Sequence, residues 1–102
     1  MFVHCVHFWL KPDLGDAERA AFVQGLRDLA DSPHVSSVRV GKPAGTPRAV
    51  VDNSYDFQLL VHFADQAAHD AYQSADDATH AAFIERFKVC WTRVLIYDSV
   101  EV

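Results

Sequence analysis

Four polar side chains of this 102-residue chain are suited to acid–base chemistry: His4, Tyr72, His80 and Asp98. An imidazole can act as a general base near neutral pH, a phenol can donate a proton, and a carboxylate can orient an imidazole. His80 lies on the apolar stripe of a predicted helix, close to its N-terminus, where the helix dipole favours the neutral ring. Taken singly, each residue is more simply explained as a core or solvated side chain. They indicate chemistry only if the fold brings them together.

The six histidines are not spaced as a metal-binding motif. Zinc sites on a helix carry pairs such as HxxxH or HxxE, and no such pair falls on one helix face here. No group of side chains in the sequence suggests a divalent-ion site. We therefore expect no metal and no other cofactor.

Hydrophobic periodicity predicts the elements that must position these residues. Runs rich in β-branched and aromatic residues predict strands at 2–10, 35–40, 55–63 and 92–100. The amphipathic pattern predicts helices at 16–30, 65–72 and 79–89. Asp16 and Asp65 are the expected N-caps, 74–78 is a break between the last two helical pieces, and the glycines and prolines of 41–54 predict a long loop.

The order β-α-β-β-α-β predicts a single α+β domain over residues 1–102 with a ferredoxin-like fold. This fold is a four-stranded antiparallel sheet with helices on one face. Its first and last strands are antiparallel neighbours, so His4 at the start of one should lie near Asp98 at the end of the other. Tyr72 and His80 can reach the same region from the helical layer.

One face of the sheet should lie under the helices. The third strand carries an unbroken apolar row on that face: Tyr55, Phe57, Leu59, Val61 and Phe63. The matching rows of the first and last strands are His4, Val6, Phe8 and Leu10, and Val94, Ile96 and Asp98. The ligand pocket predicted between this face and the helices is lined by Val6, Phe8, Phe57, Leu59, Phe83 and Ile96.

The other face is not a normal solvent face. It combines Asp56 and Gln58 with a mainly apolar set: Val3, Cys5, His7, Trp9, Leu60 and His62. An exposed patch of this kind indicates an interface, so we expect these six residues to join two identical subunits. The alternative is a lone sheet with a few exposed apolar residues, which is common in monomers.

Composition limits the partners and the location. The net charge is -5 and no basic stripe is present, which argues against a nucleic-acid partner or an anionic membrane. No apolar run approaches the roughly 20 residues of a membrane span, and the N-terminus does not resemble a signal peptide. The two cysteines do not make a disulfide framework, so we expect reduced thiols and a cytoplasmic location.

Over nearly its whole length the sequence resembles the stress-responsive dimeric α/β-barrel domain family. The resemblance depends on the order and spacing of short motifs: His4-Cys5-Val6-His7-Phe8 before Lys11-Pro12, Gly41, Tyr55-Asp56, Phe63, Tyr72, His80 with Phe83, and Val94-Leu95-Ile96-Tyr97-Asp98. It implies a homodimer in which two four-stranded sheets face each other as a barrel.

One member of that family is a cofactor-free plant polyketide (olivetolic acid) cyclase. The resemblance implies that its catalytic Tyr and His match Tyr72 and His80, its partner carboxylate Asp98, and its first-strand pocket histidine His4. Two features differ: the segment between Tyr72 and His80 is two residues longer here, and Phe57 replaces a third-strand histidine.

We therefore expect a homodimer that binds a small organic or aromatic ligand. Any catalysis would be cofactor-free and cyclase- or lyase-like, with His80 as base and Tyr72 as donor. The alternatives are a non-catalytic stress-protective or scaffolding dimer and a cofactor-free monooxygenase of the antibiotic-biosynthesis type. An open cavity with His80 and Tyr72 pointing into it would favour a binder or an enzyme, and a filled one the protective dimer.

Overall fold

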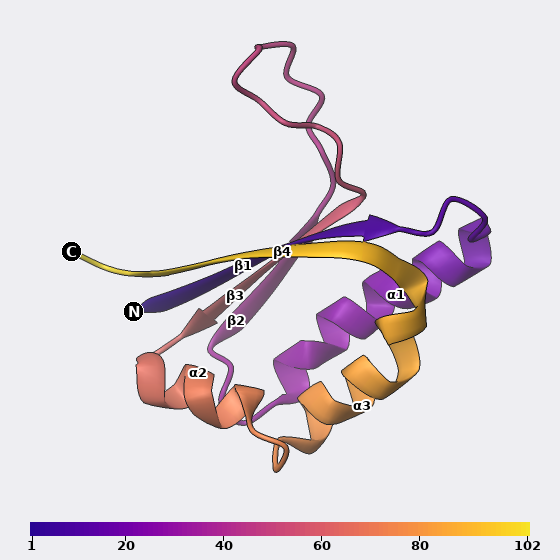
Figure 1. The fold of residues 1–102 in the computed structure, drawn as a ribbon. Coiled ribbons are helices and arrows are strands. Elements are labelled where there is room, and N and C mark those ends of the chain that lie inside the picture. Colours follow the sequence, from indigo (N-terminus) through magenta and orange to yellow (C-terminus); the bar gives the residue numbers. More distant parts are fainter.

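The structure is a computed structural model that describes residues 1–102, and three α-helices cover one face of its antiparallel sheet (Figure 1). The strands are β1 (Phe2–Leu10), β2 (Ser37–Gly41), β3 (Phe57–Phe63) and β4 (Trp91–Val100), in the order β2-β3-β1-β4. The helices are α1 (Asp16–Asp28), α2 (Gln66–Gln73) and α3 (Ala78–Phe87). The predicted α+β, ferredoxin-like fold is confirmed, with the second helical region divided at the expected break.

The observed N-cap residue matches the sequence prediction for α2 but not for α1. Asp65 caps α2 as predicted, because its carboxylate accepts a hydrogen bond from the Ala68 amide at 2.9 Å. The prediction for α1 is wrong by one residue: Gly15 is the N-cap and Asp16 is already helical. The Glu18 carboxylate accepts a hydrogen bond from the Gly15 amide, which is the Glu half of a capping box, and glycine supplies no side chain for the other half. Asp16 instead adds negative charge to the first turn, where the helix dipole favours it.

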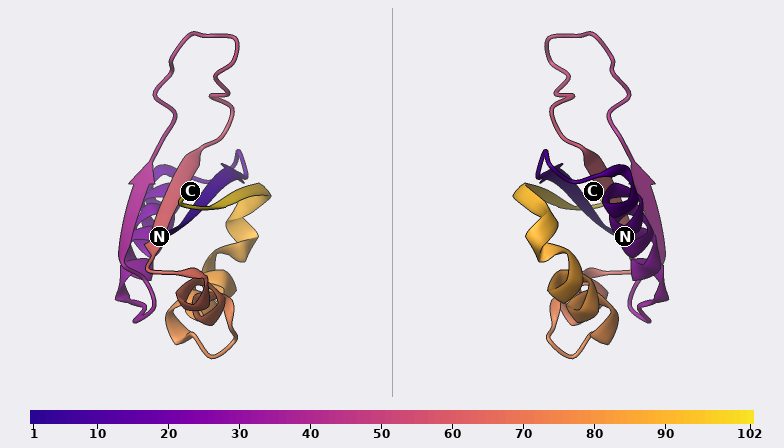
Figure 2. Two further views of the ribbon diagram at one scale, coloured as in Figure 1. Left: turned by 90° about the vertical axis from the view of Figure 1, so that its left-hand side faces the viewer. Right: turned by 90° about the vertical axis from the view of Figure 1, so that its right-hand side faces the viewer.

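The face of the sheet under the helices forms the core (Figure 2). Burial alternates along β1, and its buried residues are Phe2, His4, Val6, Phe8 and Leu10. This alternation confirms the predicted helix-facing row of the first strand. Phe22 of α1 is fully buried against aromatic rings from β1, β3 and α3. The aromatic cluster under α1 therefore holds the helical layer on the sheet.

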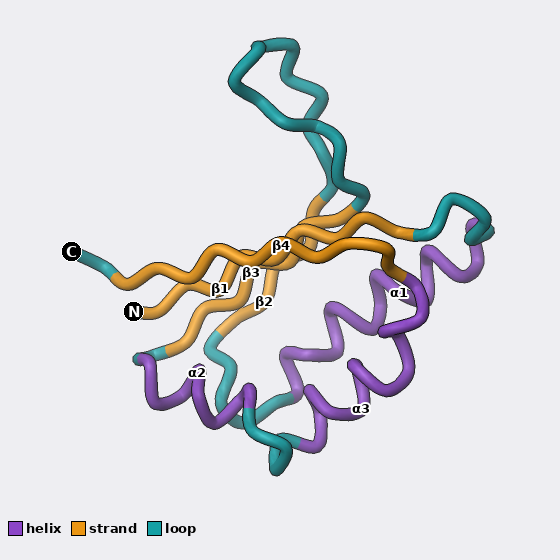
Figure 3. Tube along the Cα trace, viewed as in Figure 1, coloured by secondary structure: helices purple, strands orange, loops and turns teal.

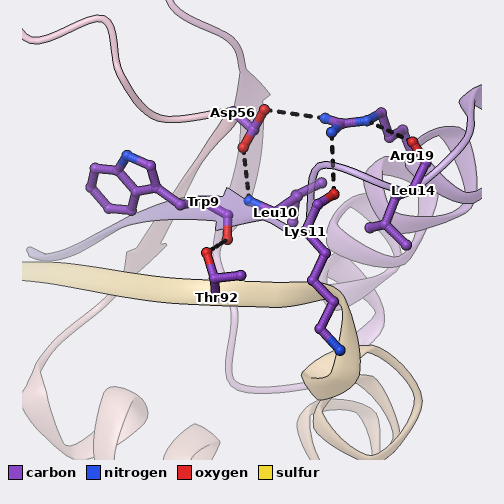
Figure 4. A network of polar contacts seen from close by, with 7 residues as sticks. All are labelled: Trp9, Leu10, Lys11, Leu14, Arg19, Asp56 and Thr92. Carbon is purple, nitrogen blue, oxygen red and sulfur yellow. Dashed lines mark hydrogen bonds and ion pairs between the residues drawn. The ribbon is translucent and has the colours of Figure 1, made fainter.

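The residues before β3 depart from the predicted alternation, because strand pairing starts two residues later than expected. Tyr55 was expected under the helices, but its ring packs edge-on against His7 on the opposite face, with the ring centroids 4.7 Å apart. Asp56 was expected on that opposite face. Instead it accepts hydrogen bonds from the Leu10 amide at 2.7 Å and from Arg19 of α1 at 3.1 Å (Figure 4). These bonds draw the backbone out of the regular pleat, so both placements were wrong.

Replacing Asp56 by Ala should lower the free energy of unfolding by about 1–3 kcal/mol. The change leaves the Leu10 amide without its acceptor and removes the ion pair with Arg19, and hydrogen bonds to charged groups contribute about that much. Urea denaturation followed by circular dichroism measures the effect. Asp13→Ala is the matched control, because Asp13 is exposed on the nearby turn. Equal stability of the two variants would contradict this role of Asp56.

The opposite face of the sheet carries no helix (Figures 1 and 2). The long loop between β2 and β3, teal in Figure 3, projects from the end of the sheet away from the helices. The base of the loop is fixed on this uncovered face, because the Trp9 indole N–H donates a hydrogen bond to the Ser54 hydroxyl at 3.1 Å. The loop therefore borders the uncovered face and not the core.

Candidate functional site

A cavity of about 150 Å³ lies between the helices and the sheet. Its polar lining consists of His4, Tyr72, Gln73 and His80. Its apolar lining consists of Val6, Phe8, Leu29, Leu59, Phe83, Ile84, Trp91, Val94 and Ile96. Because Ile96 on the edge strand β4 is 46 % exposed, the cavity is reached from that edge. Five of the six predicted pocket residues line this cavity.

The sixth predicted pocket residue, Phe57, does not line it. Phe57 shares the helix-facing side of the sheet, but it stands at the start of β3, next to Gly41 and Val40 of β2. Its ring packs against Phe22 of α1, with the centroids 6.1 Å apart. Phe57 is paired with the cavity residue Phe8 but lies on the side of it that faces β2, so the prediction chose the correct face but the wrong position across the sheet.

Tyr72 and His80 come together from two helices. Tyr72 lies in the last turn of α2 and is buried, and His80 lies in the first turn of α3. Their ring centroids are 4.4 Å apart. No hydrogen bond within the protein shifts the pKa of the Tyr72 hydroxyl or of the His80 ring. Both polar groups are therefore free to bond to a molecule in the cavity.

Asp77 fixes the position of His80, and the sequence analysis missed it. The Asp77 carboxylate caps α3 by accepting a hydrogen bond from the His80 amide at 2.9 Å. The hydroxyl of Ser32, in the segment after α1, donates to the same carboxylate at 2.6 Å, and both residues are buried. An Asp directly before the first residue of a helix is an N-cap signal, and Asp77 offered this signal in the sequence.

Burial shifts the pKa values of His80 and Tyr72 in opposite directions. Burial lowers the pKa of His80, and the charge of Asp77 opposes this shift without cancelling it. Burial, helped by the charge of Asp77, raises the pKa of Tyr72. His80 is therefore a neutral acceptor and Tyr72 a protonated donor near neutral pH. Burial, and not only the helix dipole, is the cause for His80.

His4 and Asp98 meet as the fold predicts. They are directly paired across β1 and β4, and His4 Nδ1 lies 2.5 Å from Asp98 Oδ1. Burial lowers the pKa of His4, and the bond to Asp98 opposes that shift. The His4 ring stands edge-on to Tyr72, with centroids 6.3 Å apart. The structure thus joins the four candidate residues in one chain of contacts, with Asp98 beside His4 and outside the cavity wall.

His69 is a second residue that the sequence analysis missed. It lies on α2 three residues before Tyr72, so the two share a helix face, and this spacing was the available signal. Its Nε2 lies 3.8 Å from Asp98 Oδ2. His4, His69 and Asp98 form a group whose ligand atoms all lie within 4.8 Å of one another. The sequence did not reveal this group, because its members come from three separate elements.

The six predicted interface residues all lie on the uncovered face and are half-buried. The strand register places them in rows across the sheet: Arg39, Leu60, Cys5 and Tyr97 form the central one. The His7 ring packs against Tyr55 and Tyr97, and its Nδ1 is buried without a hydrogen-bond partner. Val3, Trp9 and His62 complete the set.

The four-stranded antiparallel sheet with helices on one face places the protein in the class of ferredoxin-like α+β proteins, and a mainly apolar cavity lies beneath the helices. Residues 2–101 match the family model described as the stress responsive A/B barrel domain, Dabb. The chain therefore belongs to the Dabb family. No curated protein sequence matches it.

Several solved structures share this fold. A Dabb family protein with a ferredoxin-like fold from Mesorhizobium loti is 27 % identical, with a TM-score of 0.79 and coverage of 99 % of this chain and 96 % of that one. A dimeric ferredoxin-like protein of unknown function from Thermobifida fusca is 17 % identical, with a TM-score of 0.78 and coverage of 98 % and 90 %.

Two further structures carry names of enzymes. The hydroxynitrile lyase of Passiflora edulis is 12 % identical, with a TM-score of 0.84 and coverage of 99 % of this chain and 93 % of that one. A putative antibiotic biosynthesis monooxygenase from Nitrosomonas europaea is 14 % identical, with a TM-score of 0.70 and coverage of 100 % and 99 %. At these identities the likeness establishes the fold and not the activity.

Proposed function

We propose that the protein binds a small organic ligand with one aromatic ring in the cavity, and that His80 and Tyr72 act on it without a cofactor. The observation that carries this proposal is the pair of unbonded polar groups, those of His80 and Tyr72, side by side in a mainly apolar wall. An apolar protein cavity of about 150 Å³ is large enough to hold benzene. Pockets for drug-sized ligands measure roughly 300–1,000 Å³, so a single ring suits this cavity better than a fused ring system.

The chemistry follows from the two protonation states. Neutral His80 accepts a proton from a phenol hydroxyl or from a carbon next to a carbonyl group, and the electron pair stays on the ligand. Tyr72 donates a hydrogen bond to the oxygen that gains negative charge. The retained electron pair then closes a ring or expels a leaving group, as in a cyclase or a lyase. Asp98 orients His4, which adds a third polar group to the wall.

A non-catalytic stress-protective or scaffolding dimer is the second candidate. The description of the family as stress responsive favours it. The unfilled cavity argues against it, because a purely structural core would fill that space with side chains. A cofactor-free monooxygenase has only the shared fold in its favour.

We further propose that two copies pair through the uncovered face. Its central row, Arg39, Leu60, Cys5 and Tyr97, crosses all four strands without any helix to cover it. A face of half-buried apolar side chains gains free energy by losing contact with water. The dimeric protein from Thermobifida fusca has the same fold and supports this pairing.

We place the protein in the cytoplasm. Cys5 and Cys90 are both unpaired, which suits a reducing compartment. No helix is long and apolar enough to cross a membrane.

The ligand proposal is tested with two probes that differ by one hydroxyl group, p-cresol and toluene. In isothermal titration calorimetry with a chelator present, we expect the wild-type protein to bind p-cresol about tenfold more tightly than toluene. A hydrogen bond contributes up to about 1.5 kcal/mol, and 1.4 kcal/mol is a factor of ten. His80→Ala and Tyr72→Phe should each remove most of this preference.

His34→Ala is the matched control, because it changes a histidine outside the cavity lining and should keep the preference. Failure of both probes to bind would contradict the ligand-binding proposal. Unchanged preference in His80→Ala would remove His80 from the site.

A further inference from the structure

Three potential ligand atoms converge at the edge of the sheet beyond the cavity. His4 comes from β1, His69 from α2 and Asp98 from β4. Their ligand atoms lie within 4.8 Å of one another, and the two imidazole rings have centroids 5.2 Å apart. Two imidazoles and one carboxylate are the donor set of many zinc and other first-row transition-metal sites.

The tautomer of His69 leaves two acceptors facing each other. Its Nδ1 lies 3.1 Å from Asp70 Oδ1, and an ionised carboxylate can only accept, so Nδ1 carries the proton. When the ring is neutral, its Nε2 carries a lone pair and lies 3.8 Å from Asp98 Oδ2. That distance is too long for a hydrogen bond. A cation between these two atoms would satisfy both.

The surroundings of His69 resemble the outer shell of a metal site. A metal-bound histidine usually donates its second ring N–H to a carboxylate, and Asp70 accepts such a bond from His69. The His69 ring is further held by Phe2, stacked at 4.3 Å between centroids, and by Phe63, edge-on at 5.5 Å. The ring is thus fixed in the orientation that directs Nε2 at Asp98.

Charge and access also favour a cation here. Asp70 and Asp98 form ion pairs with histidines only, so no Lys or Arg neutralises the cluster. The Asp98 side chain is 38 % exposed while those of His4 and His69 are 6 % and 14 % exposed. An ion can therefore enter past the carboxylate, and water can complete its coordination.

We propose that His4, His69 and Asp98 bind a divalent transition-metal ion of the zinc class, with Asp70 as the positioning residue for His69. The ion would replace the proton between His4 Nδ1 and Asp98, after a rotation of the carboxylate that separates these two atoms. This site goes beyond the proposed acid–base function, although it shares His4 and Asp98 with it. Because His4 also lines the cavity, the ion would lie beside the cavity wall on the side of His4.

Cobalt(II) is the probe, because its visible absorption reports coordination by protein ligands. Untagged protein is stripped with a chelator, exchanged into metal-free buffer and titrated with cobalt(II), then with zinc(II) in competition. We expect one ion per chain and complete displacement by zinc. His69→Phe keeps the aromatic stack on Phe2 and should weaken cobalt binding by about 100-fold or more. Asp70→Asn should weaken it by about 10–100-fold, the usual effect of losing such an outer partner.

His34→Ala is the matched control and should bind cobalt as the wild type does. Absence of saturable binding to the wild-type protein, or equal binding by His69→Phe, would overturn the proposal. The outcome is independent of the ligand proposal, because this titration contains no phenol and the p-cresol titration contains a chelator. Each proposal can therefore fail while the other stands.

Discussion

Leu60→Glu should prevent the proposed pairing of two copies and leave the protein monomeric. Leu60 lies in the middle of the uncovered face, between Cys5 of β1 and Arg39 of β2 in the strand register. A two-fold interface uses the same patch on both copies, so one substitution places two carboxylates in the contact. Each loses its hydration there at a cost of several kcal/mol.

We expect the dimer to weaken by at least about 100-fold, which corresponds to roughly 3 kcal/mol. The fold of the single chain should survive, because the introduced carboxylate would face water in the monomer with Arg39 as a cross-strand partner. Sedimentation velocity over a range of protein concentrations measures the association. Circular dichroism of the same samples reports whether the fold is retained.

Val89→Glu is the control for this experiment. Val89 is 60 % exposed in the turn after α3, away from the uncovered face, so the same change of chemistry should leave the dimer intact. A wild-type protein that sediments as a monomer, or a Leu60→Glu dimer of unchanged strength, would contradict pairing through this face.

The features that sequence alone predicted are those set by strand periodicity and topology. The unbroken apolar row of β3 indicated which face of the sheet lies under the helices, and the burial of β1 alternates as that choice predicts, because side chains point to opposite faces with a period of two. The ferredoxin-like order then made β1 and β4 antiparallel neighbours, and His4 and Asp98 are indeed directly paired. These inferences needed no knowledge of individual side-chain contacts.

The errors arose where a single side chain outweighs the pattern. Asp56 takes its hydrogen bonds from Leu10 and Arg19, and those bonds break the alternation that Tyr55 was expected to follow. Phe57 obeys the alternation, but periodicity gives only the face of a sheet and not which of the neighbouring strands a cavity lies over. Such details depend on which atoms meet in space, and spacing along the chain does not contain that information.

The missed residue His69 illustrates the same limit for the site. Its link to Asp98 joins α2 to the far end of the chain, and no local motif marks that contact. Only its position three residues before Tyr72, on the same helix face, connected it to the predicted site. Metal motifs read along one helix fail for a cluster assembled from three elements.

The affinity for p-cresol should fall as the pH is lowered below 6.5, while the affinity for toluene stays constant. In the proposed complex His80 accepts a hydrogen bond from the phenol, and a protonated imidazole cannot accept one. Burial lowers the pKa of His80 from its ordinary value of 6.5, so the ring is neutral above pH 6.5 and binding is fully developed there. The affinity then decreases as the pH falls through the lowered pKa, until p-cresol binds only about as tightly as toluene, a total loss of about tenfold.

The other titratable groups facing His80 set the window of this experiment. Burial alone would raise the pKa of Asp77, but hydrogen bonds from the His80 amide and Ser32 outweigh it and lower that pKa, so Asp77 stays ionised throughout. The raised pKa of Tyr72 keeps its hydroxyl protonated. His4 is the other group whose charge acts on His80 and can change in this range. Comparing p-cresol titrations of the wild type and His80→Ala isolates the His80 contribution, since any part due to His4 persists in the variant. The same pH dependence in both proteins would show that His80 does not contact the hydroxyl group, and the role of general base would then pass from His80 to another group in the wall.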